Sequence, residues 1–381
     1  MDFNLNSDQQ MLRQTLRQIA QKELAPRAAN IDRTSAFPAE GLAKLAASGV
    51  LGLTLPAAVG GGGANSVSFV LAVEEVAKAC ASTALVFVTH AVASLGVLIG
   101  GQEPLKRRYL PALTRGEKLA AFAATEAGSG ANPVAIQTSA RKQDDRYVVN
   151  GSKVFITSGG EADLYLTVVR TSDAPGPAGL SLLAVEKDSP GLSMGRKDDR
   201  MGLNGSSPRE IVFQDCAVPV ENLLGAEGGF MPLGMAMGGL GALGAAAMAL
   251  GLSQAALEAS ISHAKSRVVL KQPIGAYQGI QFLVSEMGAA VDAMRAHVYY
   301  AAFVRDTTPP PHLDVFKAKL FATETALEVI DKGLQVHGGQ GYTKDLPLER
   351  YYRDARGLTL HFSPSETLKE TIGKFLLGLM P

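Results

Sequence analysis

The spacing of apolar residues changes twice along this sequence, and that change limits the folds open to the chain more than any other feature. From Asp8 to about Lys118 the apolar residues recur with the period of an α-helix. Short β-rich runs follow from about Leu119, and helical spacing returns at Phe230 and lasts to the end. Because 381 residues exceed what one simple core holds, we predict an α+β multidomain protein with domains at 1–118, 119–228 and 229–381.

Local signals predict the individual elements. We expect N-terminal helices over residues 9–24, 39–47, 66–80 and 84–99, with a short one before Pro111 and with Pro26 just beyond the end of the first. In the middle region Asn150-Gly151 lies between two β-rich runs, which is the signal of a type I′ hairpin turn. Further strands are expected over 164–169, 180–185 and 210–213, and long C-terminal helices over 240–265, 280–304 and 313–336.

Composition excludes several classes of partner. Lys plus Arg and Asp plus Glu both number 36, so there is no basic field for nucleic acid and no polybasic segment for a membrane surface. Cys80 and Cys216, the two cysteines, fit neither a metal-ligand spacing nor a disulfide framework, which suits a reducing compartment. The N-terminus lacks a basic region followed by an apolar run. We therefore expect a cytoplasmic protein without a metal site.

One uncharged stretch could be mistaken for a membrane span. No charged residue occurs between Glu227 and Glu258, and such a length would cross a bilayer. The stretch is mostly Ala and Gly, however, rather than Leu, Ile and Phe. We therefore predict a buried helix that its neighbours approach closely, and no membrane span.

Common catalytic motifs do not identify the chain. The sequence contains no GxxxxGK[ST] loop, no HExxH and no GxSxG. Gly128-Ser129-Gly130 begins like a dinucleotide fingerprint, but Pro133 replaces the third glycine and no βαβ unit surrounds it.

Six blocks do stand out, in a fixed order along the chain. They are FAATEAGSG at 122–130, NGSKVFITSGG at 150–160, MGLNGS at 201–206, Arg267 with Gln278, QVHGGQGY at 335–342 and YRDAR at 352–356. Taken together, they resemble the acyl-CoA dehydrogenase family over about residues 5–378. The resemblance implies an N-terminal α-helical domain, a middle β-barrel-like domain and a C-terminal four-helix bundle. It also implies FAD, held between the domains and across a subunit boundary.

The same resemblance assigns the FAD contacts. Thr125 and Thr157 would hold the edge of the isoalloxazine ring, and Phe155 stands where the family usually has Trp. Arg267 would pair with the diphosphate of a neighbouring subunit's FAD, and Gln335 with Gly338 and Gly339 would receive its adenine-diphosphate part. The full set is Phe122, Thr125, Gly130, Phe155, Thr157, Arg267, Gln278, Gln335, Gly338 and Gly339. Each assignment has a simpler alternative. Phe155 could be a core residue of a strand, Arg267 could be a solvent-exposed helix residue, and Gly338 and Gly339 could simply end a helix.

Departures from the family pattern fall in the substrate site. Ala131 replaces a serine that usually meets cofactor and substrate, and Phe362 occupies the position of the Glu that removes the substrate α-proton. Two other base positions known in the family, within residues 237–242 and 88–90, contain no acid here. Ala131, Phe362 and Ser363 are expected to meet the substrate, and His361 and Glu366 are the candidates for a substitute base.

The predicted function is that of an acyl-CoA dehydrogenase-like oxidoreductase acting on the α,β-carbons of an acyl thioester, with a non-standard or absent base. Alternatives are an enoyl-thioester reductase, a C–S bond-cleaving enzyme of the desulfinase type, a base-less partner subunit and a scaffold that keeps FAD only for stability. The resemblance implies an acyl-CoA or acyl-carrier substrate in fatty acid or carboxylic acid metabolism. It also implies an electron-transfer flavoprotein as partner and a homotetramer or a heterotetramer with a related chain.

Overall fold

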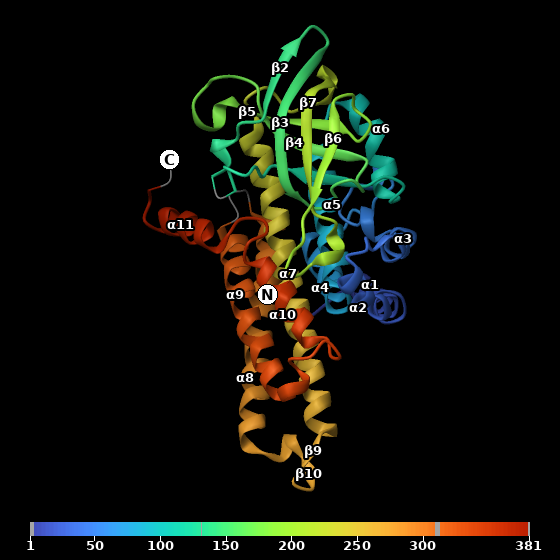
Figure 1. Cartoon of the computed structure of the whole chain (residues 1–381), viewed down its shortest axis with the longest axis vertical. Helices are drawn as coiled ribbons and strands as arrows, with labels where there is room; N and C mark the ends of the chain where they lie inside the picture. The colour runs from blue at the N-terminus through green and yellow to red at the C-terminus, as the bar shows by residue number, and fades with distance from the viewer. Residues whose placement is uncertain (1–3, 131, 309–312, 380–381) are drawn as a thin grey trace.

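The computed structural model describes residues 4–130, 132–308 and 313–379. Figure 1 shows an elongated molecule with the strands at one end and long helices running to the opposite end. The elements change from helix to strand between Thr114 and Ala120, and back to helix between Leu224 and Phe230. The predicted order of helices, strands and helices is confirmed.

The N-terminal part is helical, as predicted, but its first helix does not stop before Pro26. The elements are α1 (Ser7–Ile19), a π-helical turn (Ala20–Leu24), α2 (Ala25–Thr34), α3 (Ala39–Ala47), α4 (Ser66–Ala79), α5 (Ala81–Gly100) and α6 (Glu103–Thr114). Pro26 stands in the first turn of α2, where its missing N–H is tolerated, so the chain stays helical to Thr34. Asn6 caps α1 by accepting the Gln9 N–H at 2.9 Å.

The middle part is a mixed sheet of eight strands. They are β1 (Ala120–Ala123), β2 (Ser139–Gln143), β3 (Arg146–Ile156), β4 (Leu164–Arg170), β5 (Leu180–Glu186), β6 (Leu192–Lys197), β7 (Arg209–Pro219) and β8 (Leu223–Leu224). The order is β6-β7-β3-β2-β4-β5-β8, and β1 pairs in parallel with β4. A core lies within the sheet, formed by residues such as Tyr147, Tyr165 and Phe213.

The predicted hairpin turn at Asn150-Gly151 is wrong. Both residues lie inside β3, and the β2–β3 turn falls at Asp144 and Asp145 instead. The pairing of β3 with β7 is irregular between Val149 and Gly151, where Gly151 has a φ of 143°. A Cβ on Gly151 would lie 2.6 Å from the Thr138 hydroxyl oxygen. The glycine therefore serves a strand irregularity and a close backbone approach, which local sequence does not separate from a turn.

The C-terminal part consists of three long helices, two shorter ones and a small hairpin. They are α7 (Phe230–Ser266), β9 (Val268–Val269), β10 (Gln272–Pro273), α8 (Gln278–Thr307), α9 (Leu313–His337), α10 (Leu348–Leu358) and α11 (Ser365–Leu376). Helices α7, α8, α9 and α10 pack together, and α7 also contacts α4 and α5. The β9–β10 hairpin lies at the end of the bundle that points away from the sheet (Figure 1).

Helices α5 and α7 are long and apolar enough to cross a membrane, yet both are core helices. In each, 78% of the most apolar window is buried inside the protein. Two glycines allow the close packing of α7: a Cβ on Gly244 would lie 2.5 Å from Val88, and one on Gly251 would lie 2.5 Å from the Glu74 carbonyl oxygen. The prediction that the uncharged stretch is a buried helix is confirmed.

Candidate active site

Two segments of the sheet lie side by side and are joined by a buried ion pair. The first, residues 124–130, is the loop after β1, and the second, 153–158, is the end of β3 with the start of the turn that follows it. The fully buried Lys153 ammonium donates to Glu126 Oε1 at 2.7 Å and to the Ala124 carbonyl at 3.1 Å. The Val154 N–H donates to the Thr125 carbonyl at 2.9 Å. These bonds fix the two segments against each other.

The backbone holds Glu126 on its other side. The N–H groups of Gln137 and Thr138 donate to its two carboxylate oxygens at 2.7 and 2.9 Å. Burial raises the pKa of Glu126, but Lys153 and these donors outweigh burial and hold the pKa below its usual range. Burial lowers the pKa of Lys153 to about 8, and Glu126 offsets part of that effect. Each partner thus helps to keep the other ionised near neutral pH.

The ring of Phe155 points outward from the end of β3. Its φ is 59°, and 57% of its surface is exposed. The register with β7 shifts between Lys153 and Ile156, so Phe155 turns outward while both of those neighbours point into the core. The strand-core alternative for Phe155 is therefore excluded.

Two threonine hydroxyls on these two segments have no partner. Within the described part of the chain, neither the Thr125 nor the Thr157 hydroxyl makes a hydrogen bond, although Thr157 is buried. Because a hydroxyl can both donate and accept a hydrogen bond, both suit the polar edge of a planar heteroaromatic ring. These two hydroxyls and the exposed aromatic ring fit an isoalloxazine group. Gly130 lies beside Thr125, Phe122 is half-buried in β1, and Ala131 lies outside the described residues.

A second group of predicted residues lies on the turn between α10 and α11. Phe362 and Ser363 both have left-handed backbones, with φ of 52° and 86°. The Phe362 ring packs on α7: a Cβ built on Gly241 would lie 2.3 Å from its Cδ1. A Cβ on Gly238, one turn earlier on the same face, would meet no atom within 4 Å. The structure thus brings together two segments that the sequence suggested as separate base positions.

The backbone N–H of Phe362 has no acceptor among the described residues, whereas the N–H groups of Leu360 and His361 both donate to the Gly357 carbonyl. This face of α7 therefore borders open space beside Gly238, next to an aromatic ring and an unpaired amide. An unpaired N–H on a rigid turn can stabilise an oxyanion.

His361 is bonded through both ring nitrogens. Its Nδ1 donates to the Gly357 carbonyl at 2.7 Å, which leaves Nε2 to accept from the Arg200 guanidinium at 3.4 Å. Burial and, to a smaller extent, the Arg200 guanidinium lower the pKa of His361 to about 4. Glu366 is exposed in the first turn of α11.

The remaining predicted residues lie at the far end of the bundle. Arg267 follows α7, Gln278 begins α8, and Gln335, Gly338 and Gly339 lie at the end of α9. All five are exposed, and Arg267 makes no ion pair within the described part of the chain. Helix α7 has 37 residues, so it is about 55 Å long. One copy of the chain does not bring this group to the segments that carry Thr125 and Phe155 (Figure 1).

Three cations of the site were not identified from the sequence: the buried Lys153 and Lys319 and the half-buried Arg200. Lys319 is fully buried on α9 and donates to the Ser363 carbonyl at 2.7 Å, and Arg200 donates to the Leu203 carbonyl at 2.8 Å. The sequence did hold one indication that Lys319 is buried, because it shares a face of α9 with the apolar Val315 and Ala322.

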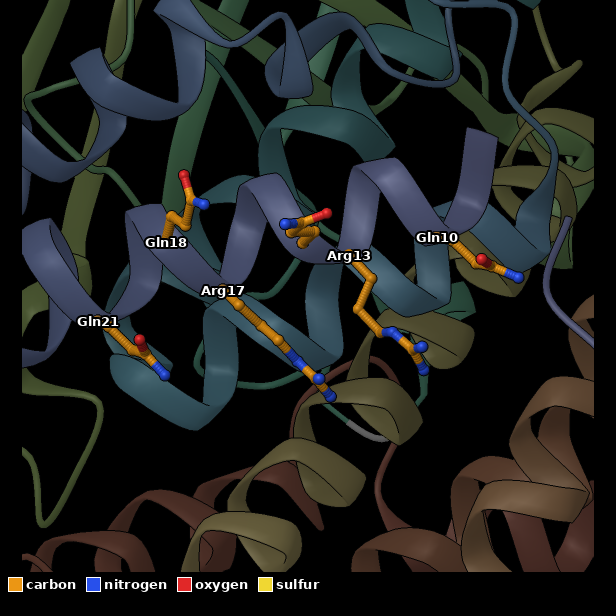
Figure 2. A pocket seen from close by; sticks show the side chains of 6 residues that line it. Gln10, Arg13, Arg17, Gln18 and Gln21 are labelled. Atoms are coloured by element: carbon orange, nitrogen blue, oxygen red, sulfur yellow. The ribbon is translucent and has the colours of Figure 1, made fainter. Parts of the chain in front are cut away.

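The hollow drawn in Figure 2 is unrelated to these residues. It measures about 400 Å³ and is lined by glutamine and arginine side chains of α1 and of the π-helical turn that continues it. The lining residues are Gln10, Arg13, Gln14, Arg17, Gln18 and Gln21. Because one helix and its continuation supply every lining residue, the hollow is a surface feature and not an enclosed site.

Comparison with known proteins identifies the class. Three profiles match in order: acyl-CoA dehydrogenase N-terminal domain over residues 6–117, middle domain over 121–216 and C-terminal domain over 234–377. The chain belongs to the acyl-CoA dehydrogenase family. It is 38% identical over 377 residues to an acyl-CoA dehydrogenase of Bacillus subtilis, covering 99% of this chain and all of that protein. It is also 38% identical over 376 residues to an acryloyl-CoA reductase (NADH) of Anaerotignum propionicum, covering 98% and 95%.

Solved structures agree. Butyryl-CoA dehydrogenase from Megasphaera elsdenii superposes with a TM-score of 0.96 at 34% identity, over 99% of this chain and all of that one. The FAD complex of PigA superposes at 0.94 with 26% identity over the whole of both chains. The predicted family, its three-part fold and FAD as the cofactor of its members are confirmed, and so is the oxidoreductase class at the level of the family.

Proposed function

We propose that this chain is an FAD-dependent oxidoreductase acting on the α,β-carbons of an acyl thioester, and that it has no carboxylate base at the usual position. One observation carries the proposal: the Phe362 ring fills the space above Gly241, where the turn after α10 meets α7. The two places from which a Glu could reach a substrate there are thus occupied by a phenyl ring and a glycine. The unpaired Phe362 N–H remains to bind a thioester carbonyl.

The candidates for a substitute base are poorly placed. His361 uses both ring nitrogens and stays neutral, because burial and the guanidinium that faces its Nε2 both lower its pKa. Taking up a proton on Nε2 would break that contact and bring two cations together. Glu366 is exposed beyond the turn. General-base catalysis contributes roughly 10²–10⁴-fold in rate, so we expect very slow oxidation of saturated straight-chain acyl-CoA.

FAD would lie against Phe155 with the hydroxyls of Thr125 and Thr157 at its ring edge, and the Lys153–Glu126 pair would keep the two segments in register. When bound, FAD supplies the hydride acceptor or donor of the reaction. The chain itself would position the thioester, exclude water with Phe362 and hold the substrate carbonyl through the Phe362 N–H.

An enoyl-thioester reductase is the second candidate. It is favoured by the similarity to an acryloyl-CoA reductase. A C–S bond-cleaving enzyme and a base-less subunit beside an active partner chain are outcomes that the tests below would reveal.

We also infer that the FAD site is completed by a neighbouring subunit, in a homotetramer or a heterotetramer with a related chain. The Arg267 group lies too far from Thr125 to share one FAD within a single copy. Apolar side chains are exposed on the same half of the molecule, including Leu270 at 83% and Tyr342 at 89%, and a subunit interface would cover them. A light-scattering mass near 39.8 kDa with FAD still bound would contradict this inference.

The remaining assignments are a cytoplasmic location and an electron-transfer flavoprotein as electron partner. The second would be tested by reduction of such a carrier in the presence of substrate.

The test of function is anaerobic reduction of the bound flavin by a panel of acyl-CoA thioesters, with wild type compared against Phe362→Glu at matched FAD occupancy. We expect little reduction in the wild type and a gain of roughly 10²-fold or more in the variant. A carboxylate buried there would have a raised pKa, which suits a base working near neutrality. Fast reduction of the wild type by butyryl- or octanoyl-CoA would show that another base exists. If a folded, FAD-replete variant gains nothing, the reductase or C–S lyase candidate moves ahead.

A further inference from the structure

Lys319 is a buried cation with no carboxylate partner. Its side chain is fully buried on α9, and within the described residues no acidic group lies within ion-pair distance of it. Its ammonium donates instead to the Ser363 carbonyl at 2.7 Å and, more weakly, to the Thr359 carbonyl at 3.4 Å. Buried lysines are usually paired with an acid, so a lysine that serves two carbonyls of one turn needs an explanation.

Those two carbonyls bracket the strained part of the turn. Between them lie Leu360, His361 and Phe362, and both Phe362 and Ser363 have the left-handed backbone that favours glycine. Non-glycine residues hold this conformation only where surrounding contacts impose it. Lys319 bonds to one side of the turn, and Arg200 contacts the other side through His361.

We propose that Lys319 is a positioning residue that clamps the turn so that the unpaired Phe362 N–H faces the thioester carbonyl. This inference rests on the proposed thioester site. The clamp acts on backbone oxygens and not on the side chain at 362, so it holds the turn in the same shape whether that side chain is a phenyl ring or a carboxylate.

Protonation supports the role. Burial lowers the pKa of Lys319 to about 8, while Glu324 and Glu366 act in the opposite direction. Near neutral pH the group therefore remains an ammonium, the form that can donate to two carbonyls at once.

A simpler role is that Lys319 only satisfies carbonyls at the end of α10, as cations often do at a helix C-terminus. That role predicts lower thermal stability when the lysine is lost, but no specific loss of thioester binding once FAD occupancy is matched. The clamp predicts both a loosened turn and weaker binding.

The experiment compares Lys319→Met and Lys319→Arg with the wild type, and uses Lys332→Met as the matched control. Lys332 also lies on α9, but it is partly exposed and pairs with Glu286 at 3.5 Å. The first measurement is the affinity of the FAD-loaded protein for acetoacetyl-CoA, followed through the flavin absorbance. The second is hydrogen–deuterium exchange of peptides that span residues 357–365.

We expect Lys319→Met to bind acetoacetyl-CoA about tenfold or more weakly, because the turn that aims the Phe362 N–H is then no longer held. A charge-assisted hydrogen bond of this kind corresponds to about tenfold or more in an equilibrium constant. Exchange in residues 357–365 should become faster, while Lys319→Arg keeps most of both properties and Lys332→Met keeps all of them. Unchanged affinity together with unchanged exchange in Lys319→Met would overturn the proposal.

Two further outcomes stay informative. If the wild type binds no thioester, the proposed function fails, but faster exchange in Lys319→Met would still establish the clamp and unchanged exchange would refute it. If Lys319→Met does not fold, Ser363→Gly is added to it. Glycine accepts a φ of 86° without strain, and Ser363 is exposed, so this change should restore folding if the lysine acts by imposing that backbone. No restoration would refute the clamp.

Discussion

The contact between Gly241 and Phe362 gives the sharpest test of the site's geometry. An alanine at 241 would place its Cβ 2.3 Å from the phenyl ring, and real side chains do not approach so closely. Overpacking of this kind costs roughly 1–3 kcal/mol. Replacing a helical glycine by alanine otherwise stabilises by about 0.5–1 kcal/mol. We therefore expect Gly241→Ala to be neutral or to destabilise by up to about 2.5 kcal/mol.

The assay is urea unfolding of the FAD-loaded protein for Gly241→Ala, Phe362→Ala and the double variant. Once the ring is removed, the alanine at 241 has room, so the helix-propensity gain should reappear. The coupling between the two substitutions should then be about 1–3 kcal/mol. Gly288→Ala on α8 is the control, since a Cβ there would meet nothing within 4 Å, and it should stabilise by about 0.5–1 kcal/mol in either background. Additivity of Gly241→Ala and Phe362→Ala within about 0.5 kcal/mol would refute the contact.

Two other predictions concern buried charge. Lys153→Met should leave Glu126 buried without its cation and weaken FAD binding, whereas the double change Lys153→Met with Glu126→Gln should recover much of the folding stability. FAD titration measures the first effect and thermal melting of the apoprotein measures the second. Normal FAD affinity in the single variant would contradict the proposal that the ion pair holds the two segments together. Burial lowers the pKa of His90 to about 4, so the unfolded chain takes up a proton first as pH falls from about 6.5. His90 alone should therefore contribute a loss of up to about 3 kcal/mol of wild-type stability toward pH 4. His90→Gln should lose less stability over that range, and equal losses in both proteins would show that His90 does not titrate as expected.

Much of the fold was predictable because it depends on local spacing. Helix α3 was predicted over its full length, and the three long C-terminal helices were placed to within about ten residues at each end. Errors occurred where one local signal serves two structures. Asn150-Gly151 suits a tight turn, but its neighbours on β7 and the contact with Thr138 make it a strand irregularity.

The sequence by itself determined the family and the kinds of residue available to a site, because both reside in the order and identity of side chains. It did not determine which of those residues meet. In the sequence nothing distinguishes Lys153 and Lys319 from lysines of the protein surface. Only the packing of strands and helices around them makes them buried hydrogen-bond donors. Gly241 and Phe362 are 121 positions apart, and only the crossing of α7 with the turn after α10 brings a ring onto a glycine. Burial and long-range contact are properties of the assembled chain, since solvent exclusion depends on every element that packs around a group.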